Sequence, residues 1–141
     1  MSNSRVPGII PPFKIVLVDD DIVQLKTIER KISIALINLG VSIEISKFQS
    51  SNAFLLDTQS YDFYVFDYEM GIECNGVELV RKKQLFGNGV VFSGNIGKIT
   101  PTEVTFVNSV RYQLVEKPDC KKVGEIIQNA IYNFSPNTNN S

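Results

Sequence analysis

The 141-residue chain contains no histidine, and this absence excludes several kinds of chemistry. Zinc sites built on imidazole, Ser–His and Cys–His nucleophile pairs, and a phosphohistidine on the chain itself all require the residue that is missing. Cysteine is scarce as well, since there are only Cys74 and Cys120 and no secretory apolar segment at the N-terminus. We therefore expect free thiols and a cytoplasmic, reducing location rather than a disulfide framework.

Neither sign of charge is in excess. Fourteen Lys and Arg residues against fifteen Asp and Glu residues give a formal charge of −1, so no general field attracts the protein to nucleic acid or to an anionic membrane. No apolar run approaches the roughly 20 residues that cross a membrane. We expect neither direct nucleic-acid binding nor membrane insertion. The 43% of hydrophobic residues is instead typical of a folded domain.

Length and local composition predict one domain with short tails. Residues 1–12 include three prolines and show no helical or strand period, which predicts an N-terminal tail. Residues 135–141 are polar and predict a C-terminal tail. The domain is then expected over residues 13–134.

Within this span, apolar runs of strand length alternate with segments of helical period. The sequence predicts strands at residues 14–18, 41–46, 62–67, 89–94 and 112–116. It predicts helices at residues 22–39, 50–57, 77–86, 101–110 and 123–134, and Gly40 is expected to end the first of them.

Five strands that alternate with five helices predict an α/β fold, a doubly wound five-stranded parallel sheet with helices on both faces. In the second strand, Ile43 and Ile45 alternate with polar residues, which is typical of a strand at the edge of a sheet. The flavodoxin-like strand order 2-1-3-4-5 fits this pattern. Ligands of such sheets bind at the carboxyl ends of the strands.

Polar side chains collect at these carboxyl ends. They are Asp19, Asp20 and Asp21 after the first strand, Asp67 after the third, Ser93 after the fourth and Lys117 after the fifth. Carboxylates gathered closely raise one another's pKa unless a cation neutralises them. Mg²⁺, which takes one or two carboxylates and keeps positions open for phosphate oxygens, suits this set. The ammonium and the hydroxyl can both bind the same anion.

Two of the acids have a simpler interpretation. An acid that follows a strand often caps the next helix, and Asp21 is a candidate for that role. Asp62 precedes its strand, at the opposite end of the sheet, and is expected to be a turn residue.

The segments IVLVDDD, YDFYVFD, VVFSG and LVEKP, in this order and spacing, resemble the receiver domain of two-component response regulators, the CheY-like phosphoacceptor domain. The resemblance extends over nearly all of residues 13–134. It implies that Asp67 accepts a phosphoryl group from a phosphohistidine on a partner histidine kinase or histidine phosphotransfer protein. It also implies that Ser93 and Lys117 contact the phosphoryl oxygens.

The resemblance implies further that Mg²⁺ is held by Asp19 and Asp20, together with Asp67 and the backbone carbonyl of Glu69. Such a domain catalyses only its own phosphorylation and dephosphorylation and is not otherwise an enzyme.

Output would follow from a switch at Ser93 and at position 114, here Leu114, that changes the protein partners of the face formed by the fourth helix, the fifth strand and the last helix. Glu69 and Asn95 match the positions that tune the lifetime of the phosphoryl group.

The sequence departs from the pattern of this family in three places. Gly71 stands where proline is usual, the path from residue 67 to residue 76 is one residue longer, and Leu114 replaces an aromatic residue. These changes favour an alternative, a pseudo-receiver that binds partners without turning over phosphate.

Two other classes are weaker. A flavin carrier would place a hydroxyl- and glycine-rich loop after the first strand, where this chain has three carboxylates. A hydrolytic phosphatase would rest only on the short pattern Asp67-Tyr68-Glu69, which is common.

Overall fold

The computed structural model describes residues 11–139. Residues 1–10 and 140–141 lie outside the described residues, and with them almost all of the predicted N-terminal tail. The strands are β1 (Phe13–Val18), β2 (Ile43–Phe48), β3 (Phe63–Asp67), β4 (Gly89–Ser93) and β5 (Gln113–Glu116). The helices are α1 (Ile22–Leu36), α2 (Ser51–Leu56), α3 (Gly76–Lys82), the short 3₁₀ helix η1 (Ile96–Lys98), α4 (Pro101–Ser109) and α5 (Cys120–Asn139).

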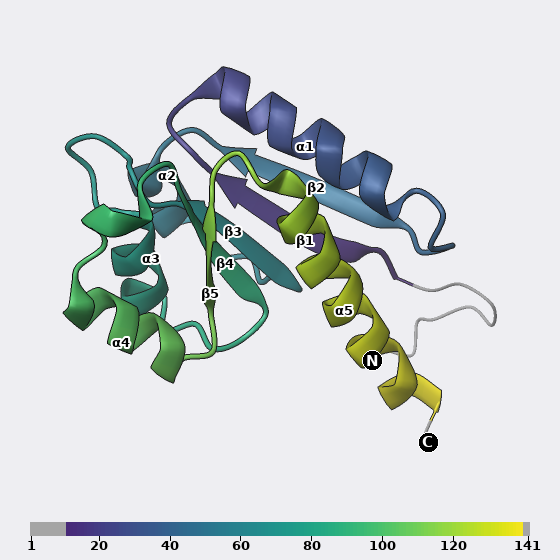
Figure 1. Ribbon diagram of the computed structural model, residues 1–141. Coiled ribbons are helices and arrows are strands. Elements are labelled where there is room, and N and C mark those ends of the chain that lie inside the picture. Colours follow the sequence, from purple (N-terminus) through teal and green to yellow (C-terminus); the bar gives the residue numbers. More distant parts are fainter. Residues whose placement is uncertain (1–10, 140–141) are drawn as a thin grey trace.

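All five strands are parallel and lie in the order β2-β1-β3-β4-β5, so the predicted doubly wound, flavodoxin-like sheet is confirmed. Helices α1 and α5 cover one face, and α2, α3 and α4 cover the other (Figure 1). The predicted edge position of the second strand is also confirmed, since β2 pairs with no strand but β1 among residues 11–139.

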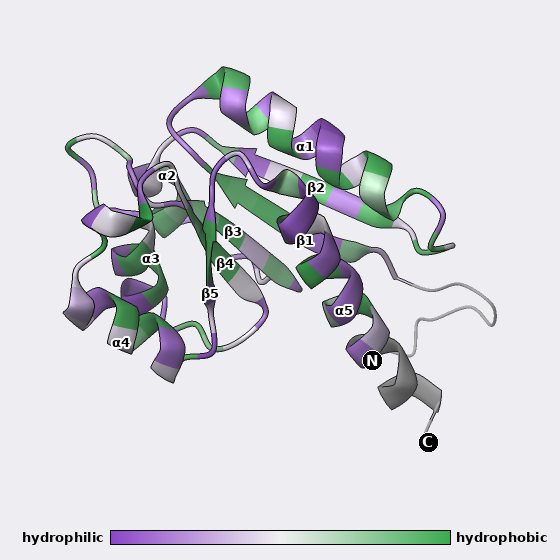
Figure 2. Ribbon diagram, in the orientation of Figure 1, coloured by the Kyte–Doolittle hydropathy of each residue, from purple (hydrophilic) through white to green (hydrophobic). Residues whose placement is uncertain are grey.

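Strand β1 lies between β2 and β3 and is buried on both faces, which explains its continuous apolar sequence. Ile15 and Leu17 pack into the core beneath α1 and α5, whereas Val16 and Val18 pack into the core beneath α2, α3 and α4. Figure 2 shows β1 as a hydrophobic ribbon and β2 as a mixed one, in keeping with the half-exposed pattern of β2. Two apolar layers thus hold the carboxyl ends of β1 and β3 in place.

Several predicted boundaries were wrong by a few residues. Helix α1 ends at Leu36 rather than at residue 39, yet Leu39 still packs on the core from the following turn, which is why the helical spacing continues past the helix. Helix α3 ends at Lys82 rather than at residue 86, because Gln84 adopts a positive φ of 55° and Leu85 N–H donates to the carbonyl of Val80.

The backbone of α5 continues through the expected C-terminal tail as far as Asn139. Val123, Ile127 and Ile131 anchor its earlier turns in the core beside α1, and each further residue adds to a turn that already exists. Polar composition alone therefore predicted the end of this helix too early. Among the described residues, no helix is both long and apolar enough to cross a membrane.

Candidate functional site at the carboxyl ends of the strands

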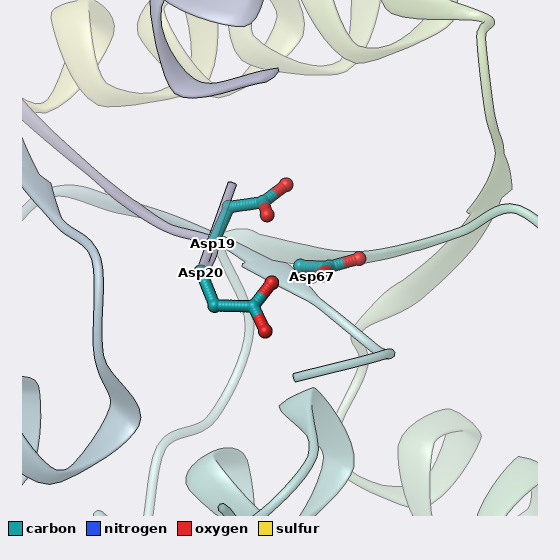
Figure 3. A group of neighbouring side chains, drawn as sticks. All are labelled: Asp19, Asp20 and Asp67. Atoms are coloured by element: carbon teal, nitrogen blue, oxygen red, sulfur yellow. The ribbon is translucent and has the colours of Figure 1, made fainter. Parts of the chain in front are cut away.

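Asp19, Asp20 and Asp67 come together where β1 and β3 end. Each offers a carboxylate oxygen, and the three atoms lie within 4.8 Å of one another. Asp19 and Asp67 are only 2% and 3% exposed, whereas Asp20 faces solvent. Figure 3 shows the three side chains extending to the same side of the strand ends. The sequence pattern predicted this cluster, because adjacent parallel strands end at one edge of the sheet.

Lys117 brings a positive charge into the cluster from the end of β5. Its Nζ lies 2.7 Å from Asp67 Oδ1 and 3.7 Å from Asp19 Oδ2. Its backbone N–H donates to the carbonyl of Ser93 at 2.7 Å, which fixes the start of the side chain beside β4. The ammonium therefore pairs with both buried carboxylates.

Burial and mutual repulsion shift the pKa values of these groups. Burial raises the pKa of Asp67 to about 7, and the Asp19 carboxylate adds to this rise while Lys117 opposes it. Burial also raises the pKa of Asp19, against the hydrogen bond from the backbone of Asp21. Burial lowers the pKa of Lys117, but its pairing with Asp67 and Asp19 outweighs that effect and raises it. One ammonium does not fully compensate the carboxylates.

The donor set fits a small divalent cation. Asp19 Oδ1 accepts a hydrogen bond from Asp21 N–H at 2.9 Å, whereas Asp19 Oδ2 is buried and accepts no hydrogen bond from the described residues. Asp67 Oδ1 is buried as well and faces the Lys117 ammonium at 2.7 Å. Three carboxylate oxygens within 4.8 Å of one another are near enough to bind one small cation together, and oxygen atoms are the ligands that Mg²⁺ prefers. That the backbone carbonyl of Glu69 is a further Mg²⁺ ligand stays a prediction.

Ser93 ends β4 beside this cluster and is fully buried. Its hydroxyl donates to Glu69 Oε2 at 2.7 Å, and Gly94 N–H donates to Glu69 Oε1 at 3.3 Å. Asn95 N–H donates to Ser93 Oγ at 3.0 Å, while the Asn95 side chain caps η1 through Gly97 N–H. Sequence reasoning placed Glu69, Ser93 and Asn95 near the site, but it did not foresee that Glu69 holds the hydroxyl.

The second half of the loop between β3 and α3 is held in place by two features. Glu73 accepts hydrogen bonds from Ser51 N–H at 2.7 Å, Ser51 Oγ at 2.8 Å and Ser50 Oγ at 3.2 Å, at the start of α2. Three residues further on, a Cβ at Gly76 would lie 2.6 Å from the carbonyl oxygen of Asp67, so this position requires glycine. Gly71 has a φ of 64°, which proline cannot adopt. Gly71 therefore gives the loop a backbone conformation that a proline at this position would not allow.

A second polar network runs from the site to α4. Tyr68, which follows Asp67, donates from its hydroxyl to Glu103 Oε1 at 2.7 Å, and Asn75 Nδ2 donates to Glu103 Oε2 at 3.2 Å. Glu103 also closes the capping box of α4 with Thr100. Leu114, at the expected switch position, packs into the apolar core beneath α2, α3 and α4. No pattern in the sequence predicted the contact between Tyr68 and Glu103.

The remaining predicted residues fall outside the cluster. Asp21 caps α1, since its side chain accepts from Val23 N–H and Gln24 N–H. Asp62 lies at the opposite end of the sheet, where its carboxylate accepts from Lys14 N–H at 2.8 Å. It is therefore a bridge between β1 and β3 as well as a residue of the turn. Cys74 and Cys120 are free thiols, as expected.

Comparison with known proteins gave matches in structure only. No protein-family model and no curated protein sequence matches the chain. A CheY-like receiver domain from Methylobacillus flagellatus superposes with a TM-score of 0.66 at 16% identity, covering 85% of this chain and 99% of its own. The BeF3-activated DrrB receiver domain gives a TM-score of 0.61 at 19% identity, with 86% and 99% covered. The chain has the fold of a response regulator receiver domain.

The receiver fold by itself does not choose a function. A chain described as an adenylate cyclase from Rhodopirellula baltica has a TM-score of 0.67 at 19% identity, covering 92% of this chain and 95% of its own. Function must therefore be argued from the side chains at the strand ends of this receiver fold.

Proposed function

We propose that this receiver domain accepts a phosphoryl group on Asp67 from a partner phosphohistidine and so takes part in a two-component phosphorelay. The observation that carries the proposal is the buried arrangement at the strand ends, in which Lys117 Nζ lies 2.7 Å from Asp67 Oδ1 beside the acidic trio of Asp19, Asp20 and Asp67. Clustered carboxylates beside an ammonium support this proposal, because together they can bind a divalent cation and an anion.

The proposed transfer is an in-line displacement at phosphorus. A carboxylate oxygen of Asp67 forms the new O–P bond while the P–N bond of the partner's phosphoimidazole breaks, and the electron pair of that bond stays on the imidazole nitrogen. Lys117 would then bind an oxygen of the transferred group as a point charge. The 141-residue sequence has no histidine, so a phosphohistidine donor would lie outside these residues.

Asp19, Asp20 and Asp67 would hold Mg²⁺, with the backbone carbonyl of Glu69 as a further ligand. When bound, this ion supplies positive charge that screens the carboxylates and the transferring phosphoryl oxygens. Asp19 Oδ2 is buried and has no hydrogen-bond partner among the described residues. A bound cation would neutralise this oxygen, which supports the proposed site. The DrrB neighbour, a receiver domain activated with BeF3, supports the expectation that an analogue of the phosphoryl group will bind here.

Output would pass through Ser93 to the face formed by α4, β5 and α5, which would then change its protein partners. The Ser93 hydroxyl is the group that would turn toward the phosphoryl oxygens. Glu69 and Asn95, which both contact it now, would set the lifetime of the phosphoryl group. Leu114 offers no ring to flip, so a switch at that position would act through apolar packing.

Intact-mass measurement after incubation with acetyl phosphate and Mg²⁺ tests the proposal. We expect the wild-type mass to rise by one phosphoryl group and the mass of Asp67→Asn to stay unchanged. Asp62→Asn is the matched control, because that carboxylate lies at the opposite end of the sheet, and it should be modified like the wild type. No modification of the wild type would contradict the proposal and favour a pseudo-receiver that only binds partners.

A further inference from the structure

The Glu69 carboxylate accepts hydrogen bonds from two donors at the end of β4. The Ser93 hydroxyl donates to one of its oxygens at 2.7 Å, and Gly94 N–H donates to the other at 3.3 Å. Ser93 is fully buried and has a single hydroxyl proton to give. The Ser93 hydroxyl can therefore donate a hydrogen bond to a phosphoryl oxygen on Asp67 only after its hydrogen bond to Glu69 has broken.

The two anions also exclude each other by charge. The hydrogen bonds from the Ser93 hydroxyl and Gly94 N–H both stabilise the charged form of the Glu69 carboxylate. A phosphoryl group would add a charge of about −1.5 to −2 at Asp67, and like charges this close repel.

We propose that the Glu69 carboxylate is a built-in competitor that holds the Ser93 hydroxyl and the Gly94 amide in the unphosphorylated protein and must be displaced before a phosphoryl group can use them. This inference rests on the proposed function of Asp67. It assigns to Glu69 a restraint on anion binding, in addition to any effect on the lifetime of the phosphoryl group. Glu69 lies in the loop between β3 and α3, so its release would also free one attachment of that loop to β4.

Titration with beryllofluoride in the presence of Mg²⁺, followed by ¹⁹F NMR, measures the competition directly. Glu69→Ala removes the carboxylate, and Glu69→Asp keeps the charge but shortens the side chain by one methylene so that it no longer reaches Ser93 Oγ. Loss of a charge-assisted hydrogen bond that competes with the anion should tighten beryllofluoride binding on the order of 10-fold in Glu69→Ala. Most of that gain should also appear in Glu69→Asp.

Glu116→Ala is the matched control for general charge. Glu116 is exposed, and its backbone pairs with Ser93 in the register of β4 and β5. We expect this variant to bind beryllofluoride as the wild type does. Thermal unfolding of each variant shows whether it is folded.

The outcomes separate this inference from the proposed function. Binding by the wild type that is unchanged or weaker in Glu69→Ala would overturn the competitor and leave the phosphoacceptor intact. A gain in Glu69→Ala that is absent from Glu69→Asp would also overturn it, because charge alone would then explain the effect. If neither the wild type nor Glu69→Ala binds beryllofluoride, the phosphoacceptor proposal fails and the competitor falls with it.

Discussion

Asp67→Asn should stabilise the metal-free protein at alkaline pH and leave its stability almost unchanged in acid. Asn matches the shape of Asp and is neutral, as the protonated carboxyl is. Asp67 is 3% exposed, and burial followed by the charge of Asp19 raises its pKa, with a smaller contribution from Glu69 and opposition from Lys117. Asp20 belongs to the same trio of carboxylates. The ionised form of Asp67 is therefore the costly one.

The direction of the pH effect follows from linkage. An acid whose pKa is higher in the folded protein keeps its proton there after the unfolded chain has lost it, so stability falls as the pH rises between the two pKa values. For Asp67 these values are 3.8 and about 7, and the difference corresponds to about 4 kcal/mol. Lys117 keeps Asp19 as a partner at 3.7 Å in the variant. We expect a gain of about 2 to 4 kcal/mol above pH 7 and almost none below pH 4.

Urea unfolding in the presence of a chelator, at about pH 4 and about pH 8, measures this difference. Glu116→Gln, which removes an exposed carboxylate, should show no comparable gain at either pH. A variant Asp67→Asn that is less stable than the wild type at about pH 8 would refute the reasoning. The same would follow from a gain of equal size at both pH values.

Mg²⁺ should raise the thermal midpoint of the wild-type protein. In Asp20→Asn, which lacks the exposed carboxylate of the trio, Mg²⁺ should raise the midpoint much less. An equal rise in both proteins would show that the ion binds elsewhere. Asp21→Ala should lower the free energy of urea unfolding by about 1 kcal/mol, since the side chain caps α1, and an unchanged value would show that the cap contributes nothing. Gly89→Ala should cost about 2 kcal/mol or more, because the new Cβ would lie 2.1 Å from the Tyr112 ring. Tyr112→Leu in the same chain should recover part of that loss in chemical denaturation, and no recovery would contradict the steric explanation.

The sheet and its acidic cluster were predictable because they depend on local patterns and on one rule of topology. The buried run of β1 and the alternation of Ile43 and Ile45 in β2 each follow from which faces meet water, and parallel strands necessarily bring Asp19, Asp67 and Lys117 to one edge. Helix ends were less predictable. Leu39 continues the helical spacing although it lies in a turn, since a loop residue can also reach the core.

The contacts made by the loops could not be predicted from the sequence. Glu73 meets Ser51, and Tyr68 meets Glu103, only because the fold brings together segments that are 22 and 35 residues apart. A helix cap joins residues at a fixed spacing in the sequence, whereas these two pairings do not. The contact between Glu69 and Ser93 belongs to the same class, since it joins the loop after β3 to the end of β4, 24 residues further along the chain.

Identifying the modified residue tests the central claim most directly. The protein is incubated with acetyl phosphate and Mg²⁺, the acyl phosphate is reduced with borohydride to an alcohol, and the peptides are sequenced by mass spectrometry. We expect homoserine at position 67 and nowhere else. Homoserine at position 19 or 20, or a phosphoryl group retained on a hydroxyl residue, would contradict it.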